Sequence, residues 1–214
     1  MRKNTLLFIL VTCIVSNLNS QKKFSNRKID NLKNQVQQLV EEDKKMTQVM
    51  IDKVFSFGEL GFQEFETSKY MGAILEENGF DVEYQVSNIP TSWLATWSNG
   101  EGGPVIALGS DFDGVPSTSQ YPGVAYEKPV VEGAPGHGEG HNIGLPIVVT
   151  SALSLKKIMI ENNIPGTLLI WPGVAEEILG SKAWYVRDGY FDDVDICIFT
   201  HVSTNMSTSW GRPT

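Results

Sequence analysis

Apolar residues recur at helical spacing in the first part of the chain. Residues 21–45 are polar apart from an apolar stripe, which predicts an amphipathic lead-in helix. The stripe consists of Leu32, Val36, Leu39 and Val40. The same spacing continues from Met46 to Phe55, and a further helix is predicted from Glu64 to Asn78, where Gly79 ends it.

After Gly79 the pattern changes to short β-rich runs separated by glycine and proline. These runs predict strands at 81–86, 92–97 and 105–108, followed by a long loop over 111–136. The rest of the chain alternates helices with buried strands. The predicted order is a helix at 142–162, a strand at 167–171, a helix at 176–188 and a strand at 195–201. This alternation predicts an α/β domain with a mostly parallel sheet.

The first twenty residues have the pattern of a secretory signal peptide. Arg2 and Lys3 precede an apolar run from Leu6 to Val15, and small or polar residues lead to a cleavage site near Ser20-Gln21. The run is too short for a membrane anchor, which takes about 20 apolar residues. A secreted or periplasmic protein with no stable membrane anchor is therefore expected. Attachment of a lipid at Cys13 is an alternative, although the residues before it are not the small ones expected.

Charge and cysteine content narrow the classes of partner. The formal net charge of −8 would become −10 once the leader removes its two cations, so nucleic acid is a poor partner. Only Cys197 would remain in the mature chain, so no internal disulfide is expected.

The expected organisation is a signal peptide at 1–20, a polar helical lead-in at 21–45 and a catalytic domain, or part of one, at 46–214.

Polar clusters follow the predicted strands at the positions where ligands bind in open α/β sheets, the carboxyl ends. They are Ser110-Asp111-Phe112-Asp113, His137 to Asn142, Glu176-Glu177 and His201. Each has an ordinary structural explanation, such as an acidic turn, a glycine-rich turn, an acidic helix start or a histidine at a strand end. Together they place all three histidines of the chain beside carboxylates, which favours a metal site.

The residue types in these clusters suit divalent cations. Asp111 and Asp113 lie two residues apart and would face the same cavity from an extended strand. The segment GHGEGHN, Gly136 to Asn142, offers imidazole nitrogens and a carboxylate that could bridge two ions. Adjacent Glu176 and Glu177 repel each other, so a nearby cation would stabilise both. One of them would then bind the metal while the other accepts a proton from an activated water.

With these residues in order, the sequence resembles the dinuclear metallopeptidase family that includes aminoacylases, carboxypeptidase G-type enzymes and aminobenzoyl-glutamate hydrolases. The likeness is strongest to the amidohydrolase branch of the last group. It covers roughly residues 45–214, beginning with GELGFQEFETS and continuing through GSDFDGVP and GAPGHGEGHN. The most specific part is the string from Gly173 to His201. The resemblance implies a three-layer α/β/α zinc-exopeptidase-like domain that hydrolyses amide bonds through a water activated by two metal ions.

The resemblance also assigns roles. Glu176 matches the catalytic base, and Asp113 is expected to support the catalytic site beside it. Glu139, His141, Glu177 and His201 match metal ligands, with Glu139 at a bridging position that usually carries cysteine. Asp111 and His137 are further candidates for ligation or support of ligands. The implied cofactors are two divalent ions, zinc above all, with manganese or cobalt as alternatives.

The implied substrates are N-acyl amino acids, aminobenzoyl-glutamate-like amides or small peptides. Family members continue into a lid and dimerisation domain and then supply one more histidine, whereas this sequence stops at Thr214. The chain therefore resembles the amino-terminal part of an enzyme whose full-length form is a homodimer, and alone it is expected to be inactive. Two alternatives stay open: a non-catalytic homologue that binds metal or a small ligand, and one half of an enzyme completed by a second chain.

Overall fold

A computed structural model of the chain describes residues 24–210. The predicted signal peptide and Cys13 lie outside these residues. The chain divides into two compact units, Met1–Gln35 and Val36–Thr214. The predicted lead-in helix is α2, Asn26–Glu42, which begins in the first unit, ends in the second and has no buried residues.

A five-stranded sheet with strand order β1-β2-β4-β3-β5 forms the centre of the second unit. Its strands are β1 (Asp81–Tyr84), β2 (Trp93–Asn99), β3 (Val105–Asp111), β4 (Gly166–Gly173) and β5 (Ile196–Phe199). The predicted α/β class is confirmed. The sheet is mixed, however, because β3 is parallel to β4 and β5 whereas β2 is antiparallel to both β1 and β4. The link between β1 and β2 is too short for the crossover that a parallel pair requires.

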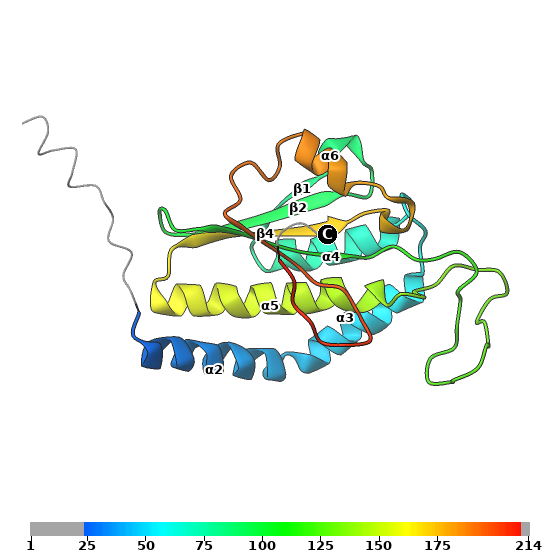
Figure 1. The fold of residues 1–214 in the computed structure, drawn as a ribbon, viewed down its shortest axis with the longest axis horizontal. Coiled ribbons are helices and arrows are strands. Elements are labelled where there is room, and N and C mark those ends of the chain that lie inside the picture. The colour runs from blue at the N-terminus through cyan, green and yellow to red at the C-terminus, as the bar shows by residue number, and fades with distance from the viewer. Residues whose placement is uncertain (1–23, 211–214) are drawn as a thin grey trace, which may run out of the picture. The chain divides into compact units, whose positions relative to one another are not determined.

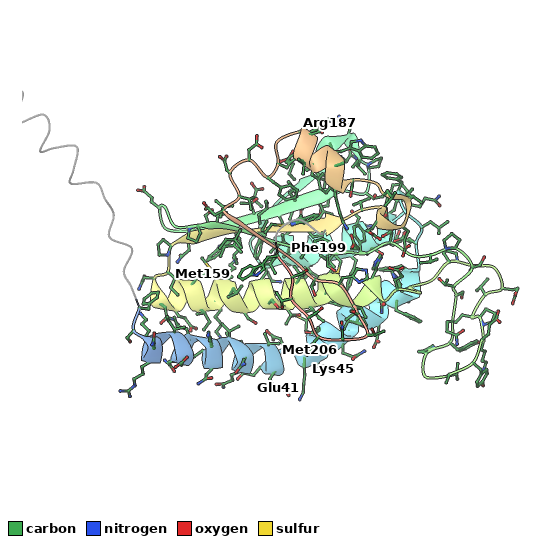
Figure 2. All side chains as sticks on the ribbon, in the orientation of Figure 1. Glu41, Lys45, Met159, Arg187, Phe199 and Met206 are labelled. Carbon is green, nitrogen blue, oxygen red and sulfur yellow. The ribbon has the colours of Figure 1, made fainter. Side chains whose placement is uncertain are left out.

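Helices cover both faces of the sheet (Figure 1). They are α3 (Lys44–Phe57), α4 (Phe65–Glu77), α5 (His141–Asn162) and α6 (Lys182–Arg187). Figure 1 shows α4 and α5 on one side of the sheet and α6 on the other. In Figure 2, Arg187 on α6 and Met159 on α5 are labelled on opposite sides of the sheet. The result is the layered arrangement expected of a sheet that carries apolar side chains on both faces.

The core lies between the sheet and the helices. Trp93, Tyr185 and Phe112 are its largest fully buried side chains. Helix α5 packs against β3, β4 and α3. By length and composition α5 could also cross a membrane, but half of its apolar window is buried inside this fold, where it is the central helix. Its apolar character is accounted for by this packing.

Two predicted elements differ in the structure. The helix predicted at 176–188 is instead a single 3₁₀ turn, η3 (Glu176–Ile178), followed by the short α6, because Leu179 and Ser181 have positive φ values of 58° and 24° that interrupt helical geometry. The strand predicted at 195–201 is β5, four residues long and exposed rather than buried. It pairs with β3, and Nζ of Lys182 at the start of α6 lies 4.4 Å from the centroid of the Phe199 ring.

The parallel strands bring their carboxyl ends to one edge of the sheet. Asp111, the last residue of β3, pairs in register with Gly173, the last residue of β4. On the other side of β3, Gly109 pairs with Phe199, the last residue of β5. The segments that follow these three strands therefore start close together, and they carry the predicted site residues.

Candidate metal centre

Asp113 organises the residues around the end of β3. Its side chain is 1% exposed, and its Oδ2 accepts a hydrogen bond from the Glu177 backbone N–H at 3.1 Å. Its backbone carbonyl accepts a hydrogen bond from Nδ1 of His141, also at 3.1 Å. One residue thus connects β3, η3 and the start of α5.

The tautomer of His141 follows from this contact. A carbonyl oxygen can only accept, so Nδ1 of His141 carries the proton and Nε2 is available as a ligand. His141 is the first residue of α5, and its side chain is buried because Gly140 turns the chain into the helix with φ 80° and ψ 22°. That left-handed conformation favours glycine.

His201 is held in the same way from the β5 side. Its Nδ1 donates to the carbonyl oxygen of Val202 at 2.6 Å, which again leaves Nε2 as the free nitrogen. The preceding Thr200 is bonded to β3, since its N–H donates to Gly109 at 3.0 Å and its carbonyl accepts from the Ser110 hydroxyl at 2.8 Å. The segment that carries His201 is therefore fixed to the neighbouring strand.

The two unprotonated ring nitrogens lie close together. Nε2 of His141 lies 3.1 Å from Nε2 of His201. Two lone pairs at this distance repel, so the pair requires either a shared proton or a cation. Zinc–nitrogen bonds are about 2.0–2.1 Å long, so two nitrogens on one ion lie at most about 4 Å apart. The observed separation suits a common metal ion.

Carboxylates surround the two histidines. Oε2 of Glu139 lies 3.5 Å from Nε2 of His201 and 3.8 Å from Nε2 of His141. Oε1 of Glu177 lies 3.8 Å from Nδ1 of His141 and is buried without a hydrogen-bond partner. A buried carboxylate oxygen without a partner is costly, and a metal ion would satisfy it.

Among residues 24–210, two groups of side chains offer ligand atoms that lie within 4.8 Å of one another inside each group. One comprises Asp111, His141 and His201, and the other comprises Glu139, His141, Glu176 and Glu177. They share His141, whose single free nitrogen can bind one ion, so the two groups are overlapping sets of donors around that residue. Nitrogen and carboxylate donors together form the usual ligand set of zinc, manganese and cobalt. The residues present therefore fit divalent metal ions.

Lys182 supplies a positive charge at this edge. Its Nζ lies 2.8 Å from Oδ1 of Asp111 and 3.9 Å from Oε1 of Glu176. Burial raises the pKa of Asp111 to about 6, although the lysine acts in the opposite direction. Asp111 is thus neutralised in part by Lys182, from the first turn of α6.

The pKa shifts at the centre reflect crowded negative charge. Burial raises the pKa of Glu177, and the nearby charge of Glu139 raises it further. Burial lowers the pKa of His141, but the hydrogen bond to Asp113 and the charges of Asp111 and Asp113 outweigh burial, so the pKa is raised overall. Excess negative charge of this kind favours binding of cations.

His137 lies apart from both ligand groups. Its Nε2 donates to the carbonyl oxygen of Val54 on α3 at 3.1 Å. Burial lowers the pKa of this imidazole. His137 belongs to neither ligand group, although Asp113 and His141 are near enough to influence its pKa, and its hydrogen bond to Val54 ties the glycine-rich segment to α3.

Sequence reasoning missed two residues near the centre, Lys182 and Glu64. Lys182 pairs with Asp111, 71 residues earlier in the chain. Glu64 is 0% exposed, and its carboxylate accepts a hydrogen bond from the Ala175 N–H, directly before Glu176. The GELGFQE string that contributes to the resemblance contains Glu64, but only the folded chain reveals its partner.

The chain is similar in sequence to curated hydrolases. No protein-family model matches the chain. A curated relative, one of the subunits of the p-aminobenzoyl-glutamate hydrolase of Escherichia coli (strain K12), is 33% identical over 162 residues, which are 76% of this chain and 33% of the relative. The chain thus spans about a third of the length of this relative.

Solved structures share the fold. A putative aminohydrolase from methicillin-resistant Staphylococcus aureus superposes with a TM-score of 0.61 and 26% identity, covering 80% of this chain and 45% of that one. A dinuclear metal-binding peptidase of the M20 family, the YXEP protein of Bacillus subtilis, gives a TM-score of 0.57 and 23% identity, covering 75% of this chain and 44% of that one. The resemblance to the dinuclear metal-dependent hydrolases is confirmed. The chain is homologous to the amino-terminal part of these proteins.

Proposed function

We propose that this chain carries the metal-binding and proton-transferring groups of a hydrolase that cleaves amide bonds in small acylated amino acids. The observation that carries the proposal is the approach of two imidazole Nε2 atoms to 3.1 Å between buried and half-buried carboxylates. Homology to an aminobenzoyl-glutamate hydrolase supports the reaction class. Both point to metal-assisted hydrolysis.

Four residues hold the metal ions in this proposal: Glu139, His141, Glu177 and His201. Zinc is the proposed ion, with manganese and cobalt as the alternatives that the same donors accept. When bound, the ions polarise the scissile carbonyl and make water a stronger nucleophile at neutral pH. Oε2 of Glu139 faces both histidines, so it would bind the ion that they share, and the resemblance supports a bridging role for this carboxylate.

Glu176 is the proposed general base. Its side chain is about a third exposed, beside the more buried Glu177, so it can reach both water and substrate. It accepts a proton from water and returns it to the leaving amine. Asp113 maintains the geometry, because it bonds both His141 and the Glu177 N–H. Asp111 and Lys182 form the charged pair on the α6 side of the same edge.

The proposed substrate class is an amide of an amino acid, which includes aminobenzoyl-glutamate-like compounds and small peptides. The Escherichia coli relative supports this class, because its name designates one subunit of a hydrolase of p-aminobenzoyl-glutamate. Assembly as a homodimer or with a second chain is a further proposal, as is secretion through the amino-terminal leader. Mass measurement of the zinc-loaded protein, alone and with candidate partner chains, distinguishes the two assemblies.

Substitution of the two adjacent glutamates tests the proposal. Glu176→Gln removes the proton acceptor and keeps the shape, so hydrolysis by the complete enzyme should fall by about 10²–10⁴-fold while zinc stays bound. Glu177→Gln removes a ligand, so zinc itself should be lost. The measurements are turnover of p-aminobenzoyl-glutamate and zinc per chain by elemental analysis.

The matched pair of variants separates the two roles. Full turnover in Glu176→Gln would remove the base assignment. Unchanged zinc content in Glu177→Gln would show that this carboxylate is no ligand. Absence of zinc, manganese and cobalt from the wild-type protein at neutral pH would reject the metal centre as a whole.

A further inference from the structure

The segment between α3 and α4 reaches the metal centre although it contributes no proposed ligand. This segment, residues 58–64, is hereafter the GELGFQE loop. Leu60 forms an isolated parallel bridge with Gly114, and the Gly114 N–H donates to the Glu59 carbonyl at 2.7 Å. The loop is therefore bonded to the backbone directly after Asp113.

Glu64 extends from this loop into the interior. Its side chain is 0% exposed, and both carboxylate oxygens accept a hydrogen bond. Oε2 accepts from the Thr91 hydroxyl at 2.7 Å, and Oε1 accepts from the Ala175 N–H at 2.8 Å. Two donors on two oxygens satisfy a carboxylate, so the side chain has a single well-defined orientation.

A second glutamate leaves Glu64 free for this contact. Glu64 stands at the N-cap of α4, where a side chain ordinarily bonds the first helical amides, yet it makes no such bond. Glu59 does so instead, since its two oxygens accept from the N–H groups of Glu66 and Thr67, each at 2.9 Å. The N–H groups of Glu66 and Thr67 at the start of α4 therefore have acceptors without the Glu64 side chain.

Ala175 is held from several sides. It has left-handed backbone angles, φ 55° and ψ 42°, which are unfavourable for a residue with a side chain. Its N–H is bonded by Glu64, and its carbonyl accepts from the Gly180 N–H at 2.8 Å. A Cβ atom placed on Gly61 would lie 2.9 Å from the Ala175 Cα, so the GELGFQE loop touches this backbone directly.

We infer that Glu64 is a positioning residue, whose buried carboxylate fixes the Ala175 amide and so sets the directions in which Glu176 and Glu177 point. The inference rests on the proposed function, in which those two residues are base and ligand. Because Ala175 is at the point where the chain leaves β4, a change in its φ or ψ rotates everything that follows. Misplacing a reacting group by about 1 Å can cost about 10²-fold in rate.

Amide hydrogen exchange tests the positioning without any need for turnover. In the metal-free wild-type protein the Ala175 amide should be protected. Glu64→Ala should accelerate its exchange about tenfold or more, because the hydrogen-bond acceptor of this amide is lost. Glu64→Gln keeps an acceptor oxygen toward Ala175 and should retain the protection. Glu66→Gln, an exposed neighbour on the same helix start, is the matched control.

Cobalt binding then reads out the effect on the centre. The visible spectrum of bound Co²⁺ depends on ligand geometry, so Glu64→Ala should alter the spectrum and weaken binding, whereas Glu64→Gln and Glu66→Gln should match the wild type. In turnover assays Glu64→Ala should lower kcat, by up to about 10²-fold, more than it raises KM. Rescue by glutamine distinguishes positioning from a requirement for negative charge.

Several outcomes would overturn the inference. One is rapid exchange of the Ala175 amide in the wild-type protein, a result that does not depend on whether Glu64→Ala folds. Another is a folded Glu64→Ala variant with unchanged exchange and an unchanged cobalt spectrum. A third is a Glu64→Gln variant as impaired as Glu64→Ala. If the complete enzyme binds zinc but shows no hydrolysis, the proposed function fails while the exchange result still decides the role of Glu64.

Discussion

His141 and His201 illustrate how backbone contacts prepare side chains for ligation. Each imidazole donates its Nδ1 proton to a main-chain carbonyl, so each presents Nε2 in a defined direction. The two carbonyls belong to residues on different segments, Asp113 after β3 and Val202 after β5. The orientation of these two proposed ligands is thus a property of the fold.

Glu139 should determine which metal the centre prefers. The resemblance places cysteine at this position, whereas glutamate offers a harder oxygen donor. Glu139→Cys should therefore raise affinity for zinc and cadmium relative to manganese. Competition titrations with the three ions measure the ratio, and Glu139→Gln controls for loss of charge. An unchanged ratio in the cysteine variant would mean that this side chain does not ligate the ion.

Glu177 and His201 can be recognised from sequence because each follows a clear apolar strand, and Glu139 and His141 because they lie in the glycine-rich motif at the start of a helix. The hydrogen-bond partners that position them cannot be recognised in this way. Lys182 and Glu64 act on residues 71 and 111 positions away, and no local spacing encodes such pairs. His137 is a candidate by sequence because its motif holds two histidines. In the structure, however, its Nε2 donates a hydrogen bond to the carbonyl oxygen of Val54 on α3.

At the scale of elements, strand order and exposure are the least predictable features. The apolar run in β5 suggests a buried strand, yet Ile196 and Ile198 are 49% and 54% exposed. An apolar composition predicts that a strand can be buried. Actual burial also requires a helix or strand packed against it, and the composition of the strand does not identify that element. The break between η3 and α6 also cannot be predicted from the sequence, because Leu179 and Ser181 are residue types that rarely take positive φ.

The exposed edge of β5 should make the protein prone to self-association. An apolar edge strand has free backbone groups and can pair with a second chain. Phe199, labelled in Figure 2 between the levels of α5 and α6, adds to the apolar surface of this strand. Ile198→Lys should reduce concentration-dependent association measured by light scattering. Ile160→Lys, at an exposed position on α5, is the control, and an equal reduction there would assign the effect to charge alone.

At the scale of the whole molecule, the metal centre connects segments that are distant in sequence. Its proposed ligands follow β4 and β5 or lie at and just before the start of α5, and Asp113 follows β3. Unfolding separates all of them. A ligand that binds the folded chain alone adds its binding free energy to the stability of the fold. Metal binding and folding are therefore expected to be coupled.

Zinc should accordingly stabilise the fold. At free zinc 100-fold above its dissociation constant, the free energy of unfolding should rise by about 2.7 kcal/mol. For a chain of this size that corresponds to a Tm increase of roughly 5 °C or more. Glu176→Gln, which leaves the proposed ligands intact, should show the full increase, whereas Glu177→Gln should show little of it. Thermal unfolding with zinc and with a chelator measures both. Equal stabilisation of the two variants would mean that zinc binds elsewhere on the folded chain, because only Glu177 of the two is proposed to contact the ion.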